Sequence, residues 1–180
     1  MFAAFAKTQV ADNILWSLAQ LDASELSDPR AARTYYDRIP LEYPASGLRD
    51  DARWNAVLLS EQLGDWAGAR ARLEGILKGR GGFLFGGPQS IWLDDAQLEL
   101  GRVLRDHFGD LAGAIAAFRK LPKDYPTSIL RDDALHELEI TLLAAGDVPG
   151  ACRALADLVK LEPGSKFIAD ATARGSACRR

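Results

Sequence analysis

A ten-residue segment recurs along this 180-residue chain, and its spacing restricts the fold more than any other feature of the sequence. Residues 43–52 (YPASGLRDDA) and 125–134 (YPTSILRDDA) differ at only two positions, and residues 87–96 and 163–171 keep the same frame. In all four copies an alanine lies eight residues after the proline. A fixed period of this kind indicates a repeat protein in which each unit packs against its neighbours.

A second landmark, Gly-Asp-x-x-x-Ala, follows the first three copies and ends at Ala69, Ala114 and Ala151. Proline cannot continue a helix and disfavours the α conformation in the preceding residue, so each Tyr-Pro pair ends a helix. The serine and the paired aspartates that follow suit the N-terminus of the next helix. Glycine then lets the backbone turn without steric strain, and the aspartate after it caps a further helix. The repeating unit is therefore helix, turn, helix.

Between these landmarks the apolar residues recur at intervals of three and four, which predicts helices that each bury one face. The recurring alanines mark places where helix axes approach closely. We expect one domain over residues 1–180, with the repeats at about residues 28–171 and flexible ends at residues 1–7 and 175–180.

The landmarks together resemble the tetratricopeptide repeat family. The resemblance implies an all-α fold, a right-handed α-solenoid of stacked helix-turn-helix repeats. The period of 37–38 residues and the Tyr-Pro-x-Ser turn are similar to those of bacterial cell-envelope members, including the outer-membrane protein assembly lipoprotein and the Tol-Pal coordinator. The residues that carry the resemblance, besides the Gly-Asp-x-x-x-Ala frame, are Leu73, Leu100, Gly101, Phe118, Pro126, Leu155 and Pro163.

Members of this family bind ligands on the concave surface lined by the first helix of each repeat. The resemblance therefore implies a partner-binding groove with mixed polarity, which suits a peptide or a protein segment. The alternative is a solvated inner face without a ligand. When the groove positions of the family are transferred to this sequence one by one, they fall on Asp51, Trp54, Glu61, Gln62, Asp95, Arg102, Arg105, Asp133 and His136.

An insertion of seven residues lengthens one repeat and falls in the glycine-rich segment 79–87, which contains Phe83 and Phe85. It lacks the Gly-Lys-Ser/Thr ending of a phosphate-binding loop, and no strand precedes it, so we exclude nucleotide binding. Its apolar residues are candidates for a partner contact. The alternative is that they fold back over the groove between repeats.

Several functional classes are disfavoured by composition. A net charge of −3 with interleaved acidic and basic residues offers no cationic surface for nucleic acid. No apolar run reaches the length of a transmembrane helix. The two histidines, His107 and His136, lack a second ligand at metal spacing, and no catalytic signature occurs, so we predict no metal, no cofactor and no enzymatic activity. Cys152 and Cys178 suggest neither a disulfide framework nor a zinc site.

The paired aspartates at residues 50–51, 94–95 and 132–133 recur in every unit, which favours a helix-start role over an active site. The sequence thus predicts a non-catalytic scaffold or adaptor for a protein or peptide, with a cell-envelope complex as the implied setting. The alternative is a structural subunit of a larger assembly, docked through its end helices and the 79–87 loop. We expect a periplasmic location if a leader is missing from this sequence, and a cytoplasmic one otherwise.

Overall fold

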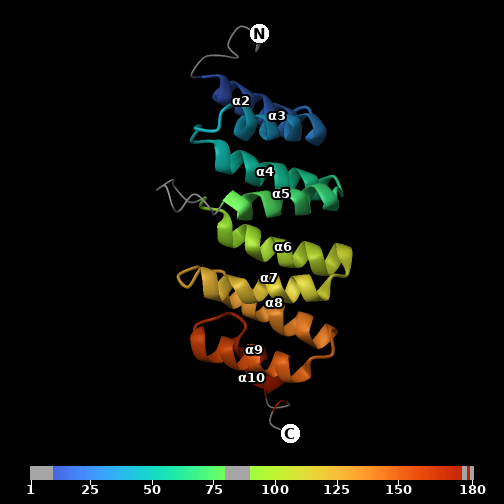
Figure 1. The fold of residues 1–180 in the computed structure, drawn as a ribbon, viewed down its shortest axis with the longest axis vertical. Helices are drawn as coiled ribbons and strands as arrows, with labels where there is room; N and C mark the ends of the chain where they lie inside the picture. The colour runs from blue at the N-terminus through green and yellow to red at the C-terminus, as the bar shows by residue number, and fades with distance from the viewer. Residues whose placement is uncertain (1–9, 80–89, 176–177, 179–180) are drawn as a thin grey trace. The chain divides into compact units, whose positions relative to one another are not determined.

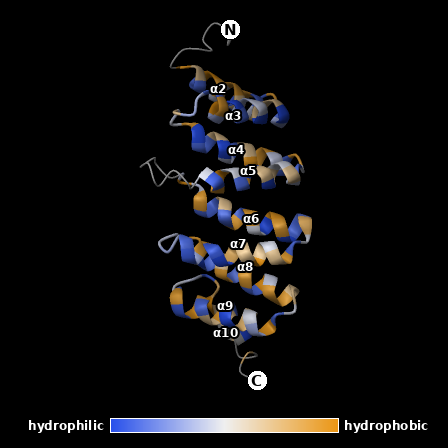
Figure 2. Ribbon diagram, viewed as in Figure 1, coloured by the Kyte–Doolittle hydropathy of each residue, from blue (hydrophilic) through white to orange (hydrophobic). Residues whose placement is uncertain are grey.

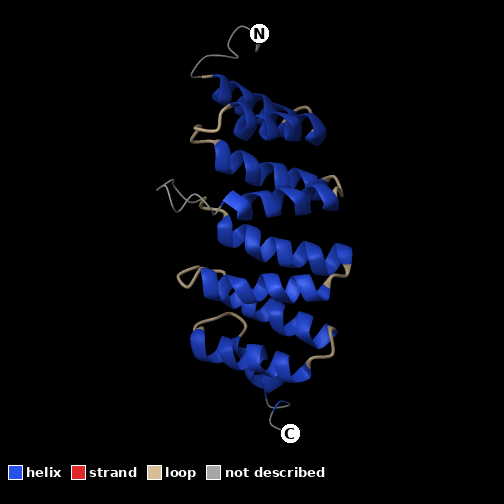
Figure 3. Ribbon diagram, in the orientation of Figure 1, coloured by secondary structure: helices blue, strands red, loops and turns tan. Residues whose placement is uncertain are grey.

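The structure is a computed structural model that describes residues 10–79, 90–175 and 178. Within these residues it contains nine α-helices. Figure 3 shows helices and loops and no strand over this part of the chain, and the prediction of an all-α fold is confirmed. The chain divides into two compact units, Met1–Leu93 and Asp94–Arg180. Whether the chain behaves as the single predicted domain stays a prediction, and each unit is described separately.

The first unit contains four helices that follow one another in chain order (Figure 1). Each helix packs against the next one along the chain, which gives two antiparallel helix-turn-helix pairs. Their core holds Leu15, Ala19, Tyr36, Ile39 and Ala56, all nearly inaccessible to solvent. The helices are α2 (Ala11–Ser24), α3 (Pro29–Glu42), α4 (Arg49–Gln62) and α5 (Trp66–Lys78).

The second unit repeats this arrangement around a core that includes Leu98, Phe118, Leu121, Leu138 and Ala154. Each helix carries both hydrophobic and hydrophilic residues, as Figure 2 shows, because part of its surface packs on neighbouring helices and the rest faces solvent. The helices are α6 (Leu93–Phe108), α7 (Leu111–Asp124), α8 (Arg131–Ala144), α9 (Val148–Leu161) and α10 (Ile168–Gly175), of which α6 starts one residue before the unit boundary.

The Gly-Asp landmark makes the turn between the two helices of a repeat, as the sequence predicts. The three glycines have positive φ angles of 68°, 62° and 77°, which L-residues rarely adopt. The aspartate after each glycine accepts a hydrogen bond from the backbone N–H three residues later, at 2.8–2.9 Å. That third residue is always a glycine, and a Cβ there would lie 2.2–2.4 Å from the aspartate carboxylate. The glycines are Gly64, Gly109 and Gly146 in the turns, and Gly68, Gly113 and Gly150 at the caps.

The recurring alanines occupy equivalent buried positions in both units. The alanine that ends each Gly-Asp landmark (Ala69, Ala114 and Ala151) is at most 2% exposed. The alanines eight residues after each proline are fully buried. Gly101 extends the same pattern, because a Cβ on it would lie 2.4 Å from the ring of Phe118. Small side chains therefore set how closely the two helices of a repeat approach.

The two cysteines depart from the sequence-based expectation, because they form a disulfide between Cys152 and Cys178. The bond ties α9 to the C-terminal tail across 26 residues of sequence, with α10 between them. Within residues 175–180, for which the sequence predicts a flexible end, Gly175 is the last residue of α10 and Cys178 forms the disulfide. Sequence spacing missed the pair because the partners meet only after α10 has packed on α9.

We predict that replacing both cysteines by serine, Cys152→Ser with Cys178→Ser, destabilises the second unit. A crosslink that closes a loop of this length lowers the entropy of the unfolded chain and stabilises the fold by about 3 kcal/mol. Urea unfolding of the oxidised protein and of the double variant measures the difference. Reductant should lower the unfolding midpoint of wild type and leave that of the double variant unchanged. Equal unfolding midpoints for oxidised and reduced wild type would contradict the stabilising role.

Candidate functional site

The first helices of successive repeats, α2 and α4 in the first unit and α6, α8 and α10 in the second, are linked by a recurring hydrogen bond. An aspartate in the first turn of one helix accepts from a serine that precedes the next first helix, at 2.5–2.8 Å. The same serine oxygen accepts a backbone N–H two residues later. The serine therefore orders the turn before its own helix and bonds the neighbouring first helix. The pairs are Asp12–Ser46, Asp94–Ser128 and Asp132–Ser165.

This link corrects the assignment of the paired aspartates to helix capping alone. The N-cap residues of α4 and α8 are Leu48 and Leu130, and neither makes a side-chain cap bond. Asp132 uses one oxygen for the backbone N–H of Asp133 and the other for Ser165 in the next repeat. Asp94 and Asp132 therefore serve the contact between repeats as well as the helix start.

In the first unit, the predicted groove residues Asp51 and Trp54 lie together, and both contact Trp92. The rings of Trp54 and Trp92 are stacked, with centroids 5.1 Å apart and planes 3° apart. The indole Nε1 of Trp92 donates to Asp51 Oδ1 at 2.7 Å. All three side chains are half-buried, so Trp54 packs within the unit instead of standing free for a ligand. Of the other two positions on α4, Glu61 is half-buried and Gln62 is exposed.

In the second unit, Asp133 and His136 contact the start of the last repeat. Asp133 Oδ1 lies 2.9 Å from Lys166 Nζ. The imidazole of His136 stacks on Phe167, with ring centroids 3.9 Å apart and planes 14° apart.

Asp95, a further predicted groove position, lies on α6 and is half-buried. Burial raises the pKa of Asp95, and the charge of the neighbouring Asp94 raises it further. Much of the predicted groove therefore holds neighbouring repeats together.

Arg102 and Arg105, the remaining predicted positions, share one carboxylate on the next first helix. Arg102 Nε and Arg105 Nη1 donate to the two oxygens of Glu137 on α8, at 2.9 and 2.5 Å. Burial would raise the pKa of Glu137, but the hydrogen bonds and charges of the two arginines outweigh it and lower this pKa. Hydrogen bonds to Asp106 and Glu137 raise the pKa of Arg105. The guanidinium groups are held in place before any partner arrives.

Sequence reasoning missed two residues on this surface, Glu137 and Ile140. Ile140 lies three residues after Glu137 on α8, hence on the same side of the helix, and it is 40% exposed. Arg102, Arg105, Glu137 and Ile140 form what we call the α6–α8 face. The positive charges of Arg102 and Arg105 could have located Glu137, because two arginines on one first helix need a carboxylate on the neighbouring first helix. Nothing in the sequence distinguished Ile140 from the core residues of α8.

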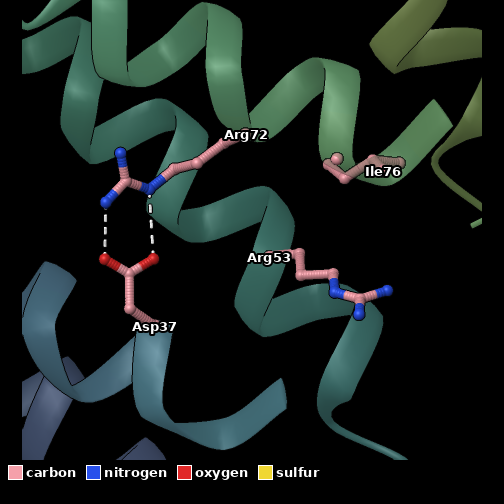
Figure 4. A pocket seen from close by; sticks show the side chains of 5 residues that line it. Asp37, Arg53, Arg72 and Ile76 are labelled. Atoms are coloured by element: carbon pink, nitrogen blue, oxygen red, sulfur yellow. Dashed lines mark hydrogen bonds and ion pairs between the residues drawn. The ribbon is translucent and has the colours of Figure 1, made fainter. Parts of the chain in front are cut away.

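A separate small pocket of about 170 Å³ lies in the first unit, between α3, α4 and α5. Figure 4 shows that Asp37 and Arg72 face each other across it, and that Arg53 and Ile76 also line it. Asp37 accepts two hydrogen bonds from Arg72, at 2.5 and 3.0 Å. Because this contact neutralises both charges and joins two second helices, the pocket is a structural junction.

No group of three or more His, Cys, Asp or Glu side chains lies close enough to hold a metal ion in the parts of the chain that the structure describes. Over the same residues, no helix combines the length and hydropathy needed to cross a bilayer. Phe83 and Phe85, the candidate contacts of the inserted segment, lie outside the described residues.

Comparison with known proteins agrees with the helical-repeat fold. A family profile for the tetratricopeptide repeat matches residues 95–128, from α6 to the turn before α8. The crystal structure of MamA aligns with a TM-score of 0.63 at 15% identity, over 89% of this chain and 84% of that chain. No curated protein matches the sequence.

Two further crystal structures align similarly. A tetratricopeptide repeat protein from Parabacteroides merdae gives a TM-score of 0.67 at 12% identity, over 90% of this chain and 57% of that chain. PilW, a widely conserved type IV pilus biogenesis factor, gives a TM-score of 0.62 at 21% identity, over 92% of this chain and 69% of that chain. At these identities the likeness concerns the fold, and the fold is that of tetratricopeptide repeat proteins.

We predict that Glu137→Gln lowers the free energy of unfolding by about 2 kcal/mol at pH 7, because a charged acceptor for two guanidinium groups is lost. The folded pKa of Glu137 lies below its ordinary value of 4.5. The stabilisation is therefore complete above about this pH and disappears as the pH falls through the folded pKa. Denaturant unfolding of both proteins across this range measures the difference.

Glu42→Gln is the matched control for this experiment. Glu42 pairs with Arg38 on the same helix, and both side chains are at least one-third exposed. Exposed pairs of this kind contribute about 0.5 kcal/mol or less. An effect of Glu137→Gln no larger than that of the control, or one that does not change with pH, would contradict the account of the shared carboxylate.

Proposed function

We propose that this chain, a tetratricopeptide repeat protein by its fold and by the repeat at residues 95–128, is a non-catalytic scaffold that binds a protein or peptide partner. The observation that carries the proposal is the α6–α8 face, where fixed guanidinium groups border an exposed apolar side chain. Arg102 is 35% exposed and Ile140 is 40% exposed. A surface of this kind offers charge-assisted hydrogen bonds and an apolar contact to a partner segment.

Preorganisation supports binding at this face. An arginine side chain in solution loses rotamer freedom when it is immobilised by a partner, which costs affinity. Here Glu137 and Asp106 already hold Arg105, whose guanidinium lies 5.7 Å from the centre of the Phe118 ring. Arg102 uses Nε for Glu137 and Nη1 for Glu99, so three of the five N–H donors of its guanidinium remain for a partner. The arrangement favours a partner with a carboxylate or backbone carbonyl beside an aliphatic or aromatic side chain.

We further propose that the partner belongs to a bacterial cell-envelope complex. Two observations support this setting. The disulfide between Cys152 and Cys178 is typical of oxidising compartments such as the periplasm. The chain also aligns with PilW, which is described as a type IV pilus biogenesis factor.

The second candidate function is that of a structural subunit docked through an end helix, and the outer side of α2 favours it. Val10, Ile14, Leu18 and Leu21 line a shallow cavity of about 370 Å³ there, together with small polar residues. Val10 is 50% exposed and Leu21 is 44% exposed. An apolar patch of this kind at the end of a repeat stack can seat on another subunit.

One capture experiment separates the two functions. The tagged chain retains partners from a lysate of its native host, and mass spectrometry compares wild type with Ile140→Glu, Leu21→Glu and the control Ile129→Glu. Ile129 is 89% exposed, lies in the turn before α8 and belongs to neither surface. We expect Ile140→Glu to lose a partner that the other two variants keep. Loss with Leu21→Glu alone favours the structural subunit, and partners unaffected by Ile140→Glu contradict binding at the α6–α8 face.

A further inference from the structure

Few buried contacts hold α10 to the second unit. Among the α10 side chains that the structure describes, Ala171 is the one that is buried, whereas α8 buries six. Ala171 and the half-buried Phe167 pack in one cluster with three leucines of α8 and α9, namely Leu135, Leu155 and Leu158. A helix in a protein owes most of its stability to the apolar face that it buries. The noncovalent packing of α10 is therefore weaker than that of α8.

The ion pair between Arg174 of α10 and Glu139 of α8 adds little to this packing. Arg174 Nη2 lies 3.0 Å from Glu139 Oε2, and the Glu139 side chain is only 3% exposed. Neither Oε2 of Glu139 nor Nε of Arg174 has a hydrogen-bond partner among the described residues. A buried ion pair offsets its loss of hydration only when hydrogen bonds satisfy both groups. This ion pair therefore orients α10 more than it stabilises it.

The two residues before α10 cover predicted groove positions on α8. Lys166 contacts Asp133, and the ring of Phe167 lies on the imidazole of His136. The Lys166 side chain is 64% exposed, and ion pairs this exposed contribute little to stability. Residues 166–175, which we call the C-terminal segment, thus occupy part of the predicted groove with little buried apolar area of their own.

The disulfide between Cys152 and Cys178 is the covalent tie of this segment. It closes a loop that contains all of α10. A crosslink of this kind opposes separation of the two chain segments that it joins, because it removes the entropy that the free ends would gain. Cys178 is exposed and Cys152 is half-buried. Exposed disulfides are open to attack by a thiolate, and they form the labile and regulatory class.

We propose that this disulfide is a redox latch. In the oxidised protein it holds the C-terminal segment on α8 and α9, and reduction by a dithiol releases the segment. Release uncovers Asp133 and His136, which lie at predicted groove positions. The latch requires no bound partner and shares no residue with the α6–α8 face, so it does not rest on the function proposed above.

The reaction is thiol–disulfide exchange. One sulfur of the dithiol attacks as a thiolate and bonds to Cys178 Sγ. The bond between the two cysteines breaks, and its electron pair goes to Cys152 Sγ, which takes up a proton. The second sulfur of the dithiol then displaces Cys178 as a thiol, and the reductant becomes a disulfide. Two electrons and two protons pass from the dithiol to the protein.

The test follows the full chain by NMR in three states: oxidised, reduced with dithiothreitol without denaturant, and reoxidised. The rings of His136 and Phe167 have centroids 3.9 Å apart, so the oxidised protein should give nuclear Overhauser contacts between them. We expect these contacts to disappear on reduction and to return on reoxidation. The amide of Ala171 donates to the Phe167 carbonyl at 2.9 Å, and reduction should speed its hydrogen exchange on the order of 100-fold.

Core amides distinguish local release from general destabilisation. Phe118 and Leu121 on α7 are fully buried, and their amides should remain protected in the reduced protein. An equal loss of protection at Phe118 and at Ala171 would overturn the proposal. A disulfide that resists dithiothreitol without denaturant would overturn it too, as would a contact between His136 and Phe167 that survives reduction.

Chemical modification of the two histidines checks that release uncovers the groove positions. The side chain of His136 is 18% exposed, whereas His107 is exposed and serves as the control. Oxidised wild type is compared with Cys152→Ser/Cys178→Ser, so no reductant reacts with the reagent, diethyl pyrocarbonate. We expect His136 to react about fivefold or more faster in the variant, and His107 to react equally in both proteins. Circular dichroism confirms that both are folded. Equal rates at His136 would contradict the proposal.

Discussion

The close approach of helices at small buried residues is the constraint on which the rest of this structure depends. Ala69, Ala114 and Ala151 occupy the same position in three repeats, each at most 2% exposed, and Gly101 admits the ring of Phe118. Protein interiors are packed without room for extra atoms, so a larger side chain at these positions would separate the helices. Only when the two helices of a repeat are this close do the first helices of neighbouring repeats come within hydrogen-bonding distance.

The contacts between first helices then determine which side chains remain for a partner. The serine-to-aspartate bonds, the stacking of Trp54 on Trp92 and the stacking of His136 on Phe167 all join one repeat to the next. A residue that joins two repeats is held in place and partly buried, so it shapes the surface of the first helices. Arg102 and Ile140 remain partly exposed on the α6–α8 face of the second unit.

The fold could be predicted from the sequence because its determinants are local. Glycine in a left-handed turn, an aspartate cap three residues before a glycine, and a proline after a helix each act within a few residues, and the structure has them at the expected positions. The site could be predicted only in part. The carried-over positions do lie on the first helices, but Trp54 and His136 pack against aromatic residues 38 and 31 positions away, which no local pattern reveals. The disulfide likewise joins residues 26 positions apart, which no local pattern reveals.

The most direct test of the central constraint is the unfolding free energy of Ala114→Leu compared with Ala116→Leu. Both alanines lie on α7, but Ala114 is fully buried and Ala116 is exposed. Overpacking at Ala114 should lower the free energy of unfolding by about 1–3 kcal/mol. The exposed substitution should change it by less than about 0.5 kcal/mol. Equal and small effects at the two positions would contradict the claim that small residues set the spacing of the helices.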